Sequence, residues 1–206
     1  MVLAHCPEPG HQCRWAARPR LAAYGLIAAF IFVERRLRRG HAASTLEALP
    51  SDRGTTRVIG ATYGYALSAG LLAPVLSNRG IGRLPTGPLQ AFGIGVMVAG
   101  LLLRIWAALT LGRFYTRTLR VSSDQTVVRT GPYRFLRHPG YAADLALWLG
   151  FGLASGNAIV AFSVASAMAL AYVRRIDAEE DMLAHELGEP YRRYMRESWR
   201  VLPWVY

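Results

Sequence analysis

The segment Arg129–Tyr141 contains the residues of this chain that are best suited to chemistry. It combines three Arg, one His and two Tyr with two Pro, directly before an apolar stretch, Tyr141–Val173, whose only charged residue is Asp144. A second polar block, Arg174–Asp181, closes the same stretch. Polar clusters at the ends of a membrane-length segment are typical of functional sites, so these two blocks are the first candidates.

Two turn signals give the first block a predicted shape. Gly131-Pro132 indicates a turn, and Pro139 suits the first turn of a helix because an N–H at that position would be unpaired. We therefore expect a helix to begin near His138, with its positive dipole end facing a carboxylate or phosphate. Alternatively, the segment is only a helix start held by Pro and anchored at the membrane interface by Tyr and His. The spacing does not decide between these interpretations.

The second block places Arg175 and Glu179 four residues apart, so a helix would carry both side chains on one face. The simpler interpretation is an intrahelical salt bridge, worth about 0.3–0.5 kcal/mol if it is exposed. The functional interpretation is a cation and an anion displayed above one pocket, where they bind a substrate carboxylate and a ligand ammonium. Spacing alone favours the salt bridge.

Both blocks belong to a predicted membrane protein. The chain is 52% hydrophobic and its apolar residues cluster in runs, whereas a bilayer span needs about 20 consecutive apolar residues. Full spans are expected at Val58–Ser77 and Leu89–Gly112, and a weaker one at Leu21–Val33. Two small-residue patterns predict close helix contacts: Gly60/Gly64, and Ala91/Gly95/Ala99.

The stretch Tyr141–Val173 is too long for one span. As a single helix it would reach about 50 Å, against a hydrocarbon thickness of about 30 Å. Gly152–Asn157 supplies turn residues near its middle, so we expect two short helices joined as a hairpin. After Met182 the chain mixes apolar and charged residues, which predicts an amphipathic cytoplasmic segment that Gly188 and Pro190 break into two short helices.

The predicted fold class is therefore all-α: a polytopic membrane protein with about five transmembrane helices, including a short C-terminal helical hairpin, plus a cytoplasmic amphipathic C-terminal helix. The expected organisation is a disordered or interfacial N-terminus (1–20), N-terminal transmembrane helices (21–112), and a cofactor-binding catalytic core with two transmembrane helices and a cytoplasmic tail (113–206).

Arginine placement orients this arrangement. The formal net charge is +11, and all 24 basic residues are Arg. Eighteen lie in the 34–57 loop, the 113–140 loop or the tail after Val173, against five on the opposite side. The positive-inside rule places both polar blocks in the cytoplasm, at an inner or plasma membrane. Because the Arg residues flank apolar runs, the basic charge indicates topology and contacts with membrane lipids, and nucleic-acid binding is not expected.

The remaining polar residues suggest structural roles. Arg104 and Asp144 lie inside predicted spans, where charges normally face the protein interior, and the two might pair with each other. The only cysteines, Cys6 and Cys13, lie near His residues but match no strong ligand spacing, so no metal site is expected.

Three motifs in the second half of the chain resemble the isoprenylcysteine carboxyl methyltransferase family, part of a superfamily that includes phospholipid methyltransferases. They cover about residues 100 to 204 and read Val127-Val128-x-x-Gly131-Pro132-Tyr133-x-x-x-Arg137-His138-Pro139-x-Tyr141, then Arg175-x-x-x-Glu179-Glu180, then Gly188-Glu189-x-Tyr191-x-x-Tyr194. The resemblance implies an integral membrane enzyme that uses S-adenosyl-L-methionine to methylate a lipophilic small molecule or prenylated substrate at the cytoplasmic face.

The resemblance also implies site residues. The substrate-side Arg of the family matches Arg175, which is the expected catalytic residue. The expected cofactor-binding residues are Gln125, Thr126, Val127, Val128, Tyr133, His138, Pro139, Gly140, Tyr141 and Glu179. A further polar contact upstream has two candidates, Thr118 and Arg120. The chain departs from the family at Ala143, where Gly is frequent, and the acidic Asp144 is unusual.

The motifs leave two other functions open. A membrane NADPH-dependent reductase of the same superfamily shares the C-terminal layout, and a small transporter or scaffold would use the Arg-rich face for lipids or partners. The absence of an evident internal repeat argues against a transporter. The methyl acceptor and the oligomeric state do not follow from the sequence.

Overall fold

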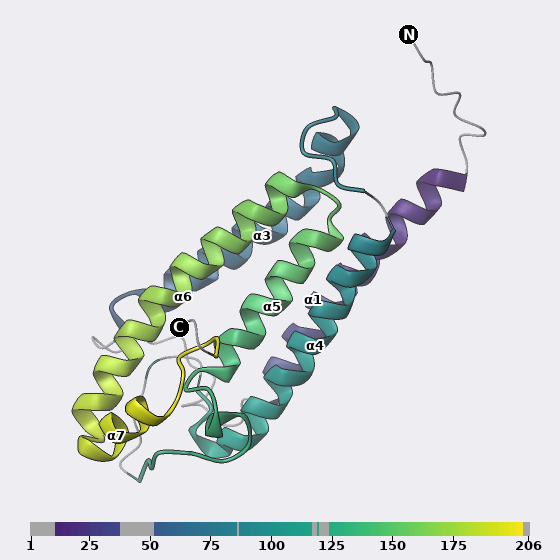
Figure 1. The fold of residues 1–206 in the computed structure, drawn as a ribbon. Coiled ribbons are helices and arrows are strands. Elements are labelled where there is room, and N and C mark those ends of the chain that lie inside the picture. Colours follow the sequence, from purple (N-terminus) through teal and green to yellow (C-terminus); the bar gives the residue numbers. More distant parts are fainter. Residues whose placement is uncertain (1–10, 38–51, 86, 117–118, 120–123, 204–206) are drawn as a thin grey trace.

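The computed structural model describes residues 11–37, 52–85, 87–116, 119 and 124–203. Within them the secondary structure is helical, as predicted. The main helices are α1 (His11–Leu37), α3 (Thr55–Asn78), α4 (Pro88–Leu111), α5 (Pro139–Ala154), α6 (Ala158–Glu186) and α7 (Glu189–Glu197), with 3₁₀ turns η2 (Gly112–Phe114) and η3 (Gly131–Arg134). The first five run side by side along one bundle, and α7 lies across its lower end (Figure 1).

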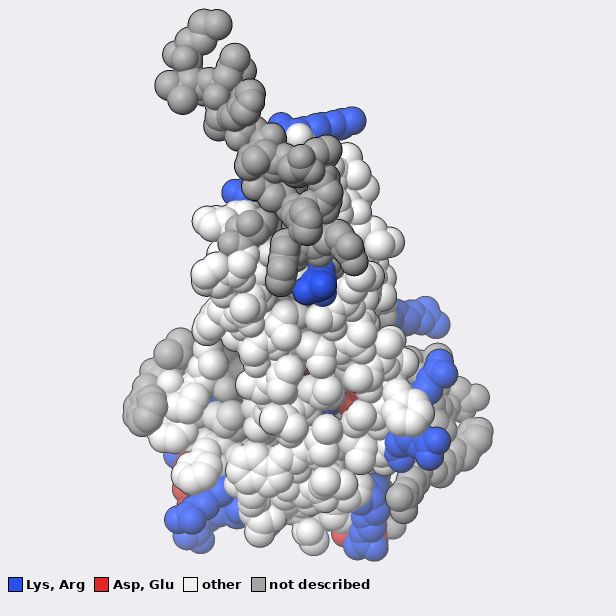
Figure 2. All heavy atoms as spheres, turned by 90° about the vertical axis from the view of Figure 1, so that its right-hand side faces the viewer, with Lys and Arg blue, Asp and Glu red and all other residues white. Residues whose placement is uncertain are grey.

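Among the described residues, three helices are long and apolar enough to cross a membrane: Thr55–Asn78, Pro88–Phe114 and Ala158–Glu186. These correspond to both full spans predicted from the sequence and to the second half of the predicted hairpin. On the face that Figure 2 shows, the middle of the bundle is almost uncharged and most Arg side chains lie toward its ends, as expected for a surface that faces lipid. The predicted number of five spans stays a prediction.

The hairpin in the C-terminal half is confirmed. α5 ends at Ala154, α6 begins at Ala158, and the Asn157 side chain caps α6 by accepting hydrogen bonds from Ile159 N and Val160 N. α5 has 16 residues, but α6 is longer than predicted, because its 29 residues continue past the apolar stretch to Glu186. The break at Gly188 is also confirmed, since this residue is the N-cap of α7.

The N-terminal helix differs from its prediction. The apolar residues 21–33 form only the middle of α1, which is helical from His11 to Leu37. Glu34 therefore lies inside the helix, where it is buried. The sequence placed it in a loop because a carboxylate after thirteen apolar residues resembles a membrane exit.

Both predicted small-residue contacts are wrong. A Cβ at Gly60, Gly64 or Gly95 would meet no described atom within 4 Å, so no described helix packs closely against these positions. The close contact lies instead between α4 and α5, on the face that carries Gly93, Met97 and Gly100. The spacing of small residues marks one face of a helix, but it does not say which face meets a neighbour.

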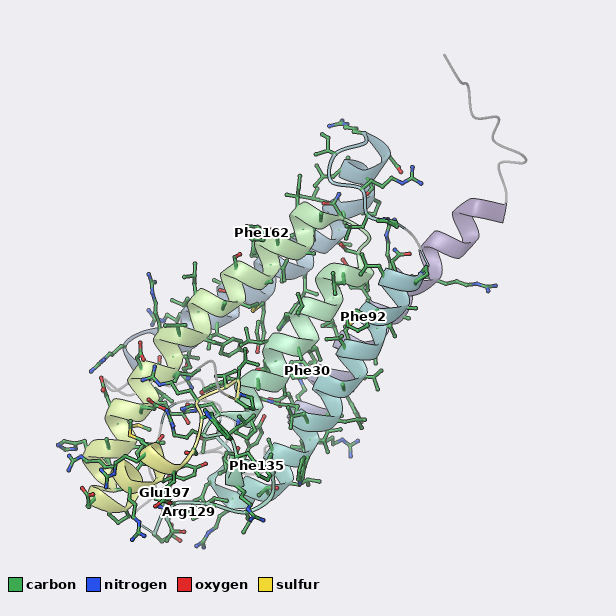
Figure 3. All side chains as sticks on the ribbon, in the orientation of Figure 1. Phe30, Phe92, Arg129, Phe135, Phe162 and Glu197 are labelled. Atoms are coloured by element: carbon green, nitrogen blue, oxygen red, sulfur yellow. The ribbon has the colours of Figure 1, made fainter. Side chains whose placement is uncertain are left out.

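The apolar core runs between the helices and ends at the polar lower part of the bundle. Trp148 and Phe151 of α5 pack edge to face with centroids 5.6 Å apart, and Phe30 of α1 joins the same cluster. Phe92 and Phe162 point away from the bundle (Figure 3) and are among its most exposed apolar residues. At the lower end an Arg129–Glu197 ion pair of 2.6 Å joins the segment before the Gly131 turn to α7.

The backbone contact between α4 and α5 leads to a stability prediction. A Cβ at Gly150 would clash with the Gly93 carbonyl and lie 2.9 Å from Met97 N. We expect Gly150→Ala to lower the free energy of unfolding in micelles by about 1–3 kcal/mol, because backbone atoms cannot move aside as a side chain can. Gly95→Ala, on the open face of α4, is the matched control and should leave stability unchanged or slightly raised. Equal stability of the two variants would contradict this packing.

Candidate functional site

The two polar blocks of the sequence come together at one cavity, here called the polar cavity, in the lower end of the bundle. The enclosed part of the cavity has a volume of about 130 Å³, and the cavity opens to the outside on one side. Of the predicted site residues, the following line it: Gln125, Thr126, Val127, Val128, Tyr133, His138, Gly140, Tyr141, Arg175 and Glu179. Pro139 does not line the cavity; it is buried and begins α5.

The turn before α5 has the predicted form. Gly131 adopts a left-handed φ of 55°, η3 follows, and His138 is the N-cap of α5. Tyr141 N and Ala142 N both donate to His138 O. Pro139 has no N–H, so the first backbone N–H of the helix belongs to Gly140, a residue that lines the polar cavity.

Glu180 holds this turn against α6. Its buried carboxylate accepts a hydrogen bond from Arg137 Nε at 2.7 Å and lies 3.2 Å from His138 Nε2. Arg200 Nη2 lies 2.7 Å from the other carboxylate oxygen. Glu180 belongs to one of the sequence motifs, but the sequence assigns it no role. Its partners are about 20 to 43 residues away, so no local pattern indicates this role.

The C-terminal residues complete the enclosure. Arg137 N donates to Trp199 O at 2.7 Å, and His138 N donates to Arg200 O at 2.9 Å. Tyr194 donates its hydroxyl proton to Tyr133 O at 2.6 Å. The chain end after α7 therefore lies along the turn and fixes its backbone.

Tyrosines around the polar cavity are neutral at physiological pH. Burial raises the pKa of Tyr194 to about 12, and it raises the pKa of Tyr133 and Tyr191 well above the usual value of a phenol. These groups therefore act as hydrogen-bond donors and aromatic surfaces rather than as proton acceptors.

Arg175 and Glu179 do share a face of α6, and Tyr141 lies between them. The Tyr141 hydroxyl donates to Glu179, and Arg175 Nε donates to the same hydroxyl at 3.1 Å. The direct intrahelical salt bridge that spacing favoured is therefore replaced by a bridge through a phenol. The His138 ring stacks on the other side of Tyr141 with centroids 5.5 Å apart.

Arg175 has a second partner that the sequence did not reveal. Its guanidinium forms an ion pair with Asp52, just before α3, and donates to Thr55 at 2.8 Å and Thr56 at 3.0 Å. Burial by itself raises the pKa of Asp52. Hydrogen bonds from Thr56 and Thr55 and the charge of Arg175 lower it by more, so the pKa lies below its usual value. Both charged side chains are almost fully buried.

Arg104 joins three helices inside the bundle. Its Nε donates to Glu34 of α1 at 2.9 Å, and its Nη1 lies 3.4 Å from Asp144 of α5. The pairing with Asp144 that the sequence suggested is present, and Glu34 is an additional partner. Tyr115 also donates its hydroxyl proton to Glu34.

A second hollow, here called the lateral cavity, adjoins the polar cavity. It lies among α1, α3, α5 and α6 and has a volume of about 730 Å³. Apolar residues such as Ile27, Phe30 and Leu67 form part of its wall. Four residues line both cavities, so the two meet there: Arg104, Thr116, Tyr141 and Arg175.

Several sequence candidates lie outside the described residues: Thr118, Arg120, Cys6 and the side chain of Cys13. Among the residues that are described, no group of three or more His, Cys, Asp and Glu side chains is placed to hold a metal ion.

Comparisons with known proteins point to one family. A family model described as the isoprenylcysteine carboxyl methyltransferase (ICMT) family matches residues 93–185. Protein-S-isoprenylcysteine O-methyltransferase B of Arabidopsis thaliana is 28% identical over 116 residues, covering 55% of this chain and 59% of that protein. The cobalt-zinc-cadmium resistance protein CzcN of Cupriavidus metallidurans is 31% identical over 116 residues, covering 56% of this chain and 48% of that protein. The chain thus spans about half the length of the curated relatives it matches.

A solved structure shares the fold. The structure of the eukaryotic intramembrane Ras methyltransferase ICMT matches with a TM-score of 0.65 and 21% identity, over 91% of this chain and 68% of that one. The similarity extends to the N-terminal helices, which lie outside the residues matched by the family model.

The buried pair of Asp52 and Arg175 predicts a pH-dependent contribution to stability. Because the pKa of Asp52 is lowered in the folded state, its contribution is present above the unfolded pKa of about 3.9 and is lost as the pH falls through the folded value. We expect Asp52→Asn to lower the free energy of unfolding by about 3–5 kcal/mol at neutral pH, since Arg175 loses its buried counter-charge.

The measurement is the unfolding midpoint of both proteins across the acidic range, where the difference between them should shrink. The matched control is Asp181→Asn, which removes an exposed ion pair to Arg53 and should cost less than about 1 kcal/mol. Equal losses in the two variants, or a difference that does not change with pH, would contradict the assignment.

Proposed function

We propose that this chain, which belongs by its residues 93–185 to the isoprenylcysteine carboxyl methyltransferase superfamily, uses S-adenosylmethionine to methylate the polar end of a lipophilic acceptor. One observation carries the proposal: a cavity lined by charged and aromatic groups meets a cavity with an apolar wall, and Tyr141 and Arg175 lie at the junction. Transfer between a polar donor and an amphiphilic acceptor needs such a junction.

The polar cavity suits the donor. When bound, S-adenosylmethionine supplies an electrophilic methyl group on a sulfonium, beside an ammonium and a carboxylate. Among the described residues, the acidic side chain that lines the polar cavity is that of Glu179, so it would pair with the ammonium. The Gly140 amide at the start of α5, with Arg104 beside it, suits the carboxylate. The faces of Tyr133 and Tyr141 suit the cationic part.

The lateral cavity suits the acceptor. Its apolar wall would hold a hydrocarbon chain, and the polar end of that chain would reach the junction. Arg175, whose guanidinium is fixed by Asp52 and Tyr141, would orient an acceptor carboxylate there. A carboxylate is ionised at neutral pH, so this reaction requires no general base, and Arg175 acts by orientation.

The residues of the junction therefore contribute mainly through positioning. Methyl transfer is an in-line displacement, and holding the two reacting atoms in line supplies much of the acceleration. The uneven distribution of Arg supports a position of the junction near the cytoplasmic face, where a water-soluble donor has access.

Direct binding of S-adenosylhomocysteine tests the proposal. Calorimetry on the purified protein should show saturable binding, and Glu179→Gln should weaken it roughly tenfold to a hundredfold, as expected for the loss of one charge-assisted hydrogen bond. Glu186→Gln is the matched control at the exposed end of α6 and should bind like the wild type.

Other outcomes would overturn the proposal. Saturable binding of NADPH without binding of S-adenosylhomocysteine would indicate a reductase instead. If neither ligand binds, and the His138→Ala and Arg175→Ala variants still function like the wild type in cells, a protein without catalytic function is indicated.

A further inference from the structure

The wall of the lateral cavity is not uniformly apolar. Beyond the junction, where the proposed acceptor chain would lie, Tyr63 of α3, Asp144 and Trp148 of α5 and Tyr172 of α6 line it. A pure hydrocarbon chain needs none of these polar groups. Their hydrogen bonds show which of them still require a partner.

Asp144 is satisfied on one carboxylate oxygen only. Its Oδ2 accepts from Tyr172 at 2.6 Å and from Tyr63 at 3.1 Å, and Arg104 Nη1 lies 3.4 Å away. Its Oδ1 accepts no hydrogen bond from any residue that the structure describes. The side chain is only 2% exposed. A buried acceptor without a partner is unfavourable, and a ligand that donates to it removes this cost.

Trp148 carries a hydrogen-bond donor that has no acceptor in the described part of the chain. Its indole Nε1 finds no acceptor among the described residues, although the residue is 1% exposed. Trp148 follows Asp144 by four positions on α5, so both side chains lie on the same helix face. The wall of the lateral cavity thus contains one unpaired acceptor and one unpaired donor, one helical turn apart.

A hydroxyl group satisfies both atoms, because it donates one hydrogen bond and accepts others. An ether oxygen or a ketone would pair only with Trp148, and an ammonium would pair only with Asp144. Both residues line the lateral cavity.

We propose that the lateral cavity selects acceptors whose hydrophobic chain carries a hydroxyl group, which donates to Asp144 Oδ1 and accepts from Trp148 Nε1. The identification of this ligand as the methyl acceptor rests on the proposed function, whereas the binding site itself does not. The acceptor class is therefore an oxygenated amphiphile with two polar points: one at the junction and one at the Asp144–Trp148 face.

Competition binding tests the site without any enzymatic assay. The full chain is placed in phosphatidylcholine nanodiscs, loaded with tritiated dodecanol, and challenged with unlabelled dodecanol, dodecyl methyl ether or dodecane. Dodecanol should displace the label at concentrations roughly tenfold lower than dodecane, as expected for about 1.4 kcal/mol of hydrogen bonding, and the ether, which pairs only with Trp148, should lie between them. Equal displacement by all three, corrected for partition into empty nanodiscs, would overturn the proposal.

Substitutions assign the effect to the two residues. Trp148→Phe keeps an aromatic ring but removes the N–H, so the preference for dodecanol over dodecane should fall about three- to tenfold. Trp106→Phe is the matched control, because Trp106 is half exposed on the outer face of α4, and it should change nothing. Asp144→Asn puts an amide in place of the carboxylate and should reduce the preference for dodecanol over the ether.

The outcomes separate this inference from the proposed function. If Trp148→Phe folds and retains the full preference for dodecanol, the hydroxyl site is wrong, whatever the result with S-adenosylhomocysteine. If S-adenosylhomocysteine fails to bind while Trp148→Phe lowers the preference, the hydroxyl site stands and the methyltransferase proposal fails. If Asp144→Asn does not fold, the comparison of Trp148→Phe with Trp106→Phe still decides.

Discussion

The polar cavity depends on a buried carboxylate at the lower end of α6. Glu180 is 2% exposed, and an ionised carboxylate in that position must be surrounded by donors, because its desolvation is otherwise prohibitive. The donors are Arg137 and His138 from the turn before α5, with Arg200 from the chain end. Satisfying one charge therefore brings together three segments that are far apart in sequence, and the space they enclose with α6 is the polar cavity.

The short length of α5 fixes the depth of that cavity. Sixteen residues of helix extend roughly 24 Å, which is less than the hydrocarbon thickness of about 30 Å. α6 continues past the start of α5 to Glu186, so its last turns stand beside the turn that precedes α5 (Figure 1). An α5 of this length leaves the polar turn nearer to the apolar middle of the bundle, and so nearer to the lateral cavity, than a full-length span would.

The sequence predicts the local features of this arrangement and misses the long-range ones. Pro139, Gly188 and the turn before Asn157 mark helix ends, because their effects on the backbone are local. The spacing of Arg175 and Glu179 predicts a shared helix face for the same reason. Asp52, Glu34 and Glu180 are missed, because each pairs with an Arg on another segment, and nothing near them in sequence identifies that partner. The candidate site could thus be located from motifs, whereas the interactions that hold its side chains in place required the structure.

The two arginines at the junction show why those missed carboxylates matter. A free guanidinium on a long side chain would lose rotamer entropy each time it oriented a ligand. Asp52 and Tyr141 already hold Arg175, and Glu34 and Asp144 already hold Arg104. The order in these side chains is therefore established during folding and does not have to be created when a ligand binds. Preorganised charges of this kind stabilise a charged reacting group without further rearrangement. The same ion pairs compensate the positive charge of both arginines, which allows an apolar chain to lie beside them in the lateral cavity.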